Sequence, residues 1–408
     1  MSLIKPFRAL RPAPGRAADV LAPPYDVLSS AEARDRAKGK PWSFLHVSKA
    51  EIDLDPAIDA HDPAVYPKAA ENLRRMIAAG VLVRDDRPCY YAYRLTWRNR
   101  AETGFAAVAS IAAYAENRIR KHEMTTPAKE DDRVRQVEAV NAQTGPVMLA
   151  YPDAPRIDAE LARVAETNPA VDVTADDGVR HQLWVIAGEA AIAALTSAVD
   201  ALPSLYIADG HHRSAAAFRV AKARGEKDGY FLAVLLPQRE MTILDYNRVL
   251  RDLNGLTPEG VLGEIGRRYS VDPADKPVRP TRADEVGMVL GGRWHRLALK
   301  PAVMAEAAHS RDPVARLPVA LLAKNILEPV FGISDQRRDK RIDFVGGGRG
   351  LGELERLVSS GAFAAGFALH PTEMHDLMAV ADAGAIMPPK STWFEPKLAD
   401  GMVSHMLE

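Results

Sequence analysis

The segment from Tyr206 to Arg213 constrains the fold of this chain more than any other. It reads Tyr-Ile-Ala-Asp-Gly-His-His-Arg, so an apolar run stops at Asp209-Gly210 and gives way to polar residues and an alanine-rich stretch. This pattern predicts a strand, a tight turn and a helix. A helix N-terminus presents unpaired N–H groups and the positive end of the dipole, so such a turn is well built to hold phosphate. The alternative is a turn that only caps the helix, with both histidines at the surface.

The polar residues of this turn are candidates for different roles. Arg213 is expected to pair with phosphate, because its planar guanidinium stays charged and matches phosphate oxygens. Neighbouring histidines point in different directions, so one is expected to contact phosphate and the other to make a structural hydrogen bond. We count Gly210 and His212 with the phosphate-binding residues, His211 and Asp209 with the catalytic ones, and Asp209 also as the candidate ligand of Mg²⁺.

The composition indicates an ordinary globular protein. The 408 residues are 47% hydrophobic and 26% charged, enough for about two to three domains. The 53 basic and 54 acidic residues leave a net charge of −1, so nucleic acid is an unexpected partner. The start lacks the apolar stretch of a signal peptide, and no segment reaches the ~18 apolar residues of a membrane span. We therefore expect a cytoplasmic protein without membrane contact, in which the single cysteine, Cys89, is buried.

Apolar periodicity and the spacing of proline and glycine predict alternating helices and short strands. The proline-rich residues 1–28 suit an extended segment rather than a helix. This alternation predicts an α/β or mixed α+β fold, which we divide into regions 1–150, 151–255 and 256–408. Helices are expected over 66–79, 157–167, 189–202, 211–224 and 351–359, and strands over 90–97, 105–111, 146–151, 181–187, 230–236, 286–290, 294–299, 341–345 and 364–369.

The block at 206–213, with its alanine-rich helix and the apolar run at 230–236, resembles the nucleotide-binding box of the ParB/sulfiredoxin fold. Within that fold it is most similar to the ADP-dependent free-serine kinases. Four further blocks identify the chain as a member of a SerK-like family of bacteria and archaea, long catalogued only as a domain of unknown function. These blocks are Pro23-Pro-Tyr-Asp-Val27, His122-Glu-Met-Thr125 with Asp132-Arg133, Leu244-Asp-Tyr-Asn-Arg248, and the run from Met387 to Lys397.

The resemblance implies a ParB/sulfiredoxin-like central unit with additional N- and C-terminal α/β regions. It also implies phosphoryl transfer from ADP or ATP, with Mg²⁺, to the hydroxyl of a small metabolite, free L-serine being the leading candidate. Such transfer needs positioning and charge neutralisation more than covalent chemistry. Two alternatives stay open: a nucleotide-binding regulatory protein without catalysis, and a phosphatase or hydrolase that uses the same anion pocket.

The charged stretch 121–133 supplies a candidate base and a second cation. Glu123 is suited to take the proton of an attacking hydroxyl, and Arg133 to pair with phosphate through two hydrogen bonds. The alternative is a solvated charged loop capped by Thr125 or Thr126. A zinc hydrolase motif is excluded, because Thr126 stands where His-Glu-x-x-His requires a second histidine.

The run from 387 to 397 superficially matches the end of a P-loop, but prolines replace the glycines and cannot donate backbone hydrogen bonds. Its polar side chains are still candidates for clasping an anion, although a rigid segment whose aromatics fill the core is equally compatible. If both ends of the chain fold over the central unit, Glu123 and Lys390 should face the same cleft as Arg213, within about 10–12 Å of it. The binding candidates in this run are Lys390, Ser391, Thr392 and Lys397.

Overall fold

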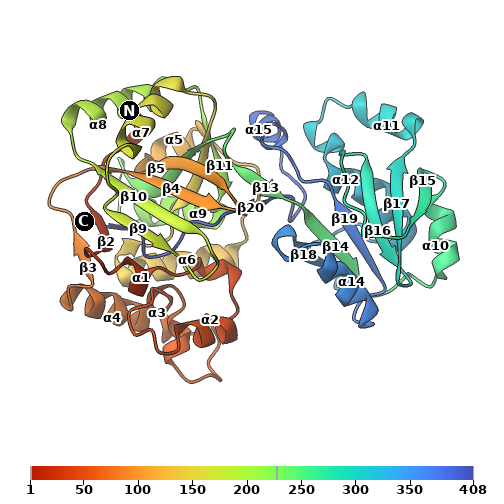
Figure 1. Cartoon of the computed structure of the whole chain (residues 1–408), viewed down its shortest axis with the longest axis horizontal. Helices are drawn as coiled ribbons and strands as arrows, with labels where there is room; N and C mark the ends of the chain where they lie inside the picture. The colour runs from red at the N-terminus through yellow and green to blue at the C-terminus, as the bar shows by residue number, and fades with distance from the viewer. Residues whose placement is uncertain (1, 227, 408) are drawn as a thin grey trace. The chain divides into compact units, whose positions relative to one another are not determined.

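The computed structural model describes residues 2–226 and 228–407 (Figure 1). Helices and strands are mixed along the chain, which confirms the expected α+β class. The contacts divide the chain into two compact units, Met1–Met241 with Pro396–Glu408, and Thr242–Glu395. These units differ from the expected three regions. Residue 150 lies inside a strand of the first unit, and residue 255 lies inside the second unit.

A nine-stranded sheet forms the centre of the first unit, in the order β6-β11-β8-β12-β5-β4-β10-β9, with β1 paired to β5. The pairs β12/β8 and β11/β6 are parallel, and the others are antiparallel. Strand β12 is apolar along nearly its whole length, as expected for a strand buried on both faces. The strands are β1 (Ile4–Lys5), β4 (Tyr90–Trp97), β5 (Arg100–Ser110), β6 (Ile119–Arg120), β8 (Val147–Tyr151), β9 (Val171–Thr174), β10 (Arg180–Ile186), β11 (Leu205–Asp209) and β12 (Tyr230–Pro237).

A second sheet completes the first unit, in the order β3-β2-β21-β7. Strand β21 comes from the end of the chain and lies between β2 and β7, so the C-terminal segment is part of this unit. The strands are β2 (Ala9–Pro12), β3 (Leu82–Arg84), β7 (Ala142–Gln143) and β21 (Ser404–Met406), and the helices of the unit are α1 (Ala17–Val20), α2 (Ser30–Ala37), α3 (Leu45–Ser48), α4 (Val65–Ala78), α5 (Ile111–Ala115), α6 (Pro127–Val140), α7 (Pro155–Ala165), α8 (Glu189–Asp200) and α9 (His211–Ala223).

The second unit contains a six-stranded antiparallel sheet in the order β15-β17-β16-β19-β14-β18, and a two-stranded sheet of β13 and β20. Helix α14 covers the larger sheet through Leu354, which is fully buried with Val249 and Val289. The elements are β13 (Thr242–Leu244), β14 (Tyr246–Leu250), β15 (Tyr269–Ala274), β16 (Glu285–Leu290), β17 (Arg293–Leu299), β18 (Ile342–Gly346), β19 (Ala365–Leu369), β20 (Trp393–Glu395), α10 (Pro258–Ile265), α11 (Pro301–Ala308), α12 (Pro318–Leu322), α13 (Glu328–Phe331), α14 (Leu351–Ser359) and α15 (Met374–Asp382).

The expected elements are present, with two corrections. The charged stretch that could have been a loop becomes helix α6 from Pro127, because proline is favoured at the first helical position. The proline-rich start is not extended throughout, since helix α1 forms over four residues that contain no proline. Cys89 is buried, as expected.

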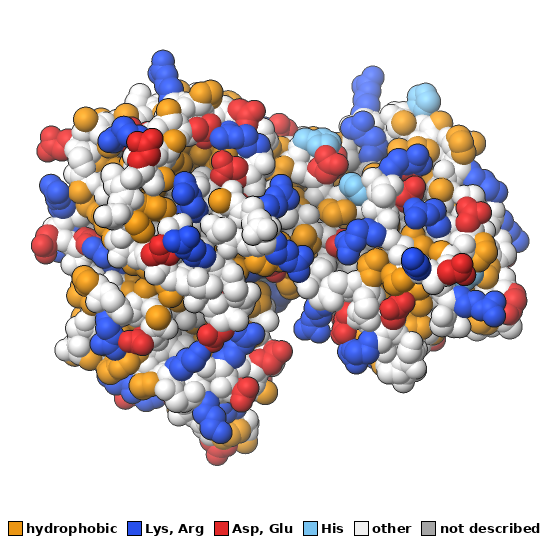
Figure 2. All heavy atoms as spheres, in the orientation of Figure 1, with side chains coloured by type: hydrophobic (Ala, Val, Ile, Leu, Met, Phe, Trp, Pro, Cys, Tyr) orange, Lys and Arg blue, Asp and Glu red, His pale blue; other side chains and the backbone are white. Residues whose placement is uncertain are grey.

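Charged side chains of both signs are interspersed over the face shown in Figure 2, in keeping with the balanced composition. None of the helices in the described residues has the length and apolar character needed to cross a membrane.

Candidate functional site

The turn between β11 and α9 has the expected strand, turn and helix. Gly210 links them with φ +104° and ψ 28°, a conformation that side chains disfavour. A Cβ at this position would lie 3.1 Å from Nε of Arg213. Glycine therefore serves two purposes here: it permits the turn, and it leaves room for the Arg213 side chain to lie against it.

Arg213 is held at the start of α9 by two contacts. Its Nη1 donates to the carbonyl of Pro146, and its Nη2 lies 3.5 Å from Oδ2 of Asp209. Burial lowers the pKa of Arg213, but the carboxylates of Asp209 and Asp26 outweigh this effect and raise it above the ordinary value. The first N–H groups of α9 have no acceptor within the helix and add to the positive potential around this guanidinium.

Asp209 lies between two cations. Lys397 Nζ is 3.3 Å from the same Oδ2 that faces Arg213. Burial raises the pKa of Asp209, yet Lys397 and Arg213 together hold it below its usual range. Because Asp209 is already paired with two cations, it is better suited to position them around an anion than to bind Mg²⁺. Among the described residues, no three His, Cys, Asp or Glu side chains surround a position for a metal ion.

His211 faces Glu123. The backbone N–H of His122 donates to Nε2 of His211 at 3.4 Å, and Nδ1 of His211 lies 3.7 Å from Oε2 of Glu123. Burial lowers the pKa of His211 to about 3, so the ring is neutral near pH 7. Because Nε2 accepts a hydrogen bond, the single ring proton is on Nδ1 and faces the carboxylate.

His122 packs against this pair from inside the unit. Its ring is fully buried and meets the His211 ring edge to face, with centroids 4.4 Å apart. Burial, with a contribution from His211, lowers the pKa of His122 to about 3. The His122 and His211 rings are therefore both neutral. Packing against His122 fixes the orientation of the His211 ring towards Glu123.

His212 connects the turn to helix α6. Its Nε2 accepts a hydrogen bond at 3.2 Å from the backbone N–H of Thr126, the residue before α6. Both histidines of the turn thus accept a backbone hydrogen bond from the segment 122–126. The expected phosphate contact of one histidine stays a prediction.

Arg133 and Arg213 line one cavity of about 40 Å³. Arg133 donates to Asp132 through Nε at 2.7 Å and lies with its Cζ 3.9 Å from the centre of the Tyr25 ring. Burial lowers the pKa of Arg133, but Tyr25 and Asp132 raise it above the ordinary value. Two permanently charged guanidinium groups, from α6 and α9, thus meet at this cavity.

Asp400 also lines this cavity, and sequence reasoning missed it. It is buried, and one of its oxygens accepts the backbone N–H of Tyr25 at 3.2 Å. Burial raises the pKa of Asp400 to about 7, although Arg213 opposes this shift. The only available signal was its closeness in sequence to Lys397, because the partners of Asp400 lie at the other end of the chain.

Lys390, Ser391 and Thr392 belong to the second unit. There, Arg248 donates to the carbonyls of Lys390 and Pro389, both at 3.0 Å, and Ser391 Oγ donates to Pro388 at 2.7 Å. These bonds fix the loop before β20. The expected position of Lys390 beside Arg213 stays a prediction.

Comparisons with known proteins give distant structural matches. No curated protein matches the chain. A conserved hypothetical protein from Pyrococcus furiosus is 13% identical, with 72% of this chain and 93% of that chain covered and a TM-score of 0.36. A free serine kinase in complex with AMP is 11% identical, with 71% and 86% covered and a TM-score of 0.35. SbnI with a C-terminal truncation, from Staphylococcus aureus, is 13% identical, with 73% and 86% covered and a TM-score of 0.36.

The family comparison covers most of the chain. A family model described as a protein of unknown function (DUF1015) matches residues 4–320. This match spans the Asp209–Arg213 turn, the Glu123 segment and Arg133, and it confirms the expected kind of family. The chain belongs to the DUF1015 family of proteins of unknown function.

Proposed function

We propose that the protein binds the phosphates of ADP or ATP at the Asp209–Arg213 turn and transfers a phosphoryl group to the hydroxyl of a small acceptor, with free L-serine as the first candidate. One observation carries this proposal: Arg213, in the first turn of α9, and Arg133, on α6, line a single cavity. Two guanidinium groups and a helix N-terminus form a strong environment for phosphate oxygens.

Glu123 supplies the base in this proposal. The acceptor oxygen forms a bond to the transferred phosphorus, the bond from that phosphorus to the nucleotide oxygen breaks, and the hydroxyl proton passes to the Glu123 carboxylate. The side chain of Glu123 is 35% exposed, so substrate can reach it, while the Nδ1–H of His211 faces Oε2 and orients the group. Asp209 holds Arg213 and Lys397 in place for the developing negative charge.

The remaining predicted ligands have supporting roles. Lys397 is near the turn through Asp209, which supports its assignment to an anionic ligand. Gly210 contributes its conformation, and His212 fixes the loop that carries Glu123. Lys390, Ser391 and Thr392 stay candidates for the same ligand. The described residues around Asp209 do not surround a position for Mg²⁺, so in this proposal the metal is carried by the nucleotide phosphates.

Mass spectrometry tests the proposal directly. The purified protein is incubated with ADP or ATP, Mg²⁺ and a panel of hydroxyl metabolites, and new phosphate esters are sought. We expect an ester, and we expect Glu123→Gln to slow its formation by about 10²–10⁴-fold, the usual contribution of a general base. Glu138→Gln, an exposed change on α6, is the matched control and should leave the rate unchanged.

The other outcomes separate the alternatives. Release of inorganic phosphate without an ester would favour the hydrolase. Nucleotide binding without any turnover would favour the regulatory protein. Absence of nucleotide binding would contradict the proposal as a whole.

A further inference from the structure

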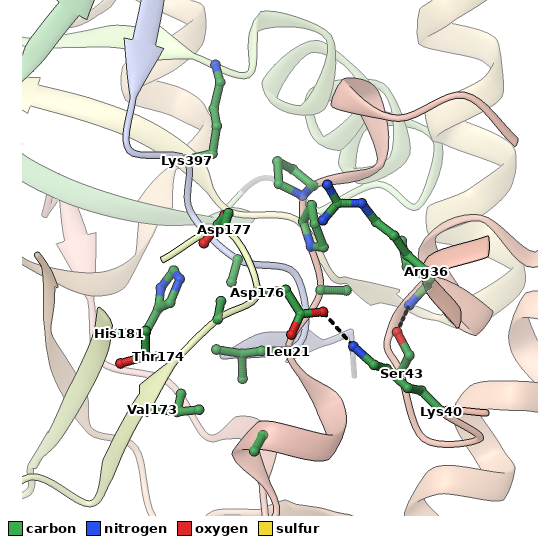
Figure 3. Close-up of a pocket in the computed structure, with 17 residues that line it drawn as sticks. Leu21, Arg36, Lys40, Ser43, Val173, Thr174, Asp176, Asp177, His181 and Lys397 are labelled. Atoms are coloured by element: carbon green, nitrogen blue, oxygen red, sulfur yellow. Dashed lines mark hydrogen bonds and ion pairs between the residues drawn. The ribbon is translucent and has the colours of Figure 1, made fainter. Parts of the chain in front are cut away.

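A second cavity of the first unit has a volume of about 140 Å³ and shares only Lys397 with the residues assigned above. Figure 3 shows Val173, Thr174 and His181 on one side of it and Arg36, Lys40 and Ser43 on the other, with Lys397 at one end. Apolar surface comes from Leu21, Pro23, Pro24 and Val173. The cavity thus combines apolar surface with charged and polar side chains, among them the carboxylates of Asp176 and Asp177. Small-molecule sites likewise combine apolar lining with polar groups that orient the ligand.

Lys397 joins this cavity to the Asp-Gly turn. Its side chain lines the cavity, and its Nζ is 3.3 Å from Asp209, which in turn lies 3.5 Å from Arg213. This cavity is also adjacent to the one that contains Arg133, since Pro24 lines the former and Tyr25 lines the latter. A ligand with one end in the larger cavity would therefore have its other end near the turn.

His181 lines the larger cavity, and its contact with Tyr93 determines which ring nitrogen carries the proton. Tyr93 Oη accepts the backbone N–H of Ala399 at 3.4 Å and lies 2.8 Å from Nδ1 of His181. Burial lowers the pKa of His181 to about 4, so the ring is neutral near pH 7. The Tyr93 hydroxyl is thus free to donate to Nδ1, which leaves the proton of His181 on Nε2.

These features favour a flat heteroaromatic ring over a small polar molecule. A small hydroxyl metabolite would gain little from walls of proline, leucine and valine. A nucleobase can stack on apolar side chains and on the plane of the Arg36 guanidinium, and its ring nitrogens accept hydrogen bonds from a group such as His181. A nucleotide carries negative charge only at its phosphate end, and Lys397 lies on the side of the cavity towards Asp209, where that end would be.

We propose that this cavity binds the base of the nucleotide whose phosphates meet the Asp209–Arg213 turn. The inference rests on the proposed function, because it assigns the second end of the same ligand. It predicts that the affinities for a nucleoside diphosphate and for bare pyrophosphate respond differently to changes in the cavity.

Calorimetry with ADP and with pyrophosphate tests this inference. Ala18 is exposed on α1 and lines the cavity, so Ala18→Trp fills it from the surface. We expect Ala18→Trp to weaken ADP binding by about tenfold or more, the loss expected when a stacked base is displaced, and to change pyrophosphate binding by less than about twofold. Ala190→Trp, at an exposed site on α8, should change neither.

The outcomes distinguish the inference from the proposed function. Unchanged ADP affinity in a folded Ala18→Trp variant, with both ligands bound by the parent protein, overturns the base site alone. Equal loss of ADP and pyrophosphate also overturns it. Absence of binding of either ligand to the parent overturns both proposals.

Photolabelling of the unmodified protein with 8-azido-ADP provides a measurement that does not depend on the folding of a variant. We expect label within residues 18–24 or 173–181, and label confined to other segments contradicts the inference.

Discussion

Gly210 shows how one backbone conformation fixes the position of a functional cation. Its φ of +104° turns the chain from β11 into α9, and its missing side chain leaves the space beside the Arg213 guanidinium open. The sequence indicates the turn, because glycine is the residue that adopts this conformation at low cost. The packing of Arg213 against the glycine becomes visible only in the structure.

We expect Gly210→Ala to lower the free energy of unfolding by about 1–3 kcal/mol, because the new Cβ combines an unfavourable φ with a close contact to Arg213. It should also weaken phosphate binding, since Arg213 must move. Gly225→Ala is the matched control: its φ is +71° and a Cβ would meet no atom within 4 Å, so it tests backbone strain alone. Urea denaturation and pyrophosphate titration of both variants measure these effects. Equal pyrophosphate affinity in the two variants would contradict the role given to Gly210.

The elements around the site differ in how well the sequence predicts them. Strands β4 and β12 and helices α9 and α14 follow from runs of apolar residues and from their glycine boundaries, which are local features. The contact of Glu123 with His211 and that of Asp400 with Tyr25 depend on which strands become neighbours in the sheets. Such long-range pairings leave no local pattern in the sequence. Contacts between residues that are far apart in the chain therefore cannot be predicted from the sequence alone.

The segment around Asp400 brings a buried carboxylate from near the end of the chain against the N-terminal segment. Asp400 pairs with Ala22 through backbone hydrogen bonds, and its carboxylate faces Arg213, Asp26, Ser48 and the N–H of Tyr25. Its pKa is about 7 in the folded protein and about 4 when unfolded. The folded state therefore holds the proton more tightly, and this group's contribution to stability is present at low pH and is lost as the pH rises towards 7.

We expect Asp400→Asn to remove this dependence. Between about pH 4 and 7, one proton changes the free energy of unfolding by at most about 1.4 kcal/mol per pH unit, so the parent should lose stability relative to the variant over that range. Urea denaturation at a series of pH values measures the difference. Parallel pH profiles for parent and variant would show that Asp400 titrates normally.

One of the two units is a continuous stretch of the chain and the other is built from two separate stretches. The second unit is a continuous segment with its own sheet and core. The first unit is discontinuous, because β21 lies inside its smaller sheet and Leu398, Met402 and Val403 are buried. The chain enters and leaves the second unit at neighbouring positions, since Thr242 pairs with Glu395.

We expect fragment 242–395 to fold alone and to unfold cooperatively. Fragment 1–241 should be strongly destabilised, because it lacks an inner strand. Joining 1–241 to 396–408 through a short Gly/Ser linker should restore folding. Circular dichroism and thermal melts of the three proteins test this expectation. A stable fragment 1–241, or an unfolded 242–395, would contradict the division into units.

Isothermal calorimetry of ADP binding tests whether Arg213 holds the phosphates of a nucleotide. Arg219 is the matched control, since it lies on the same helix, is more exposed and pairs with Glu130 and Asp131. We predict that Arg213→Ala weakens ADP binding by about 1.5–3 kcal/mol, the range for a lost hydrogen bond to a charged group, and that Arg219→Ala leaves it unchanged. Equal affinity of the parent and a folded Arg213→Ala variant, or an equal loss in both variants, would contradict the claim.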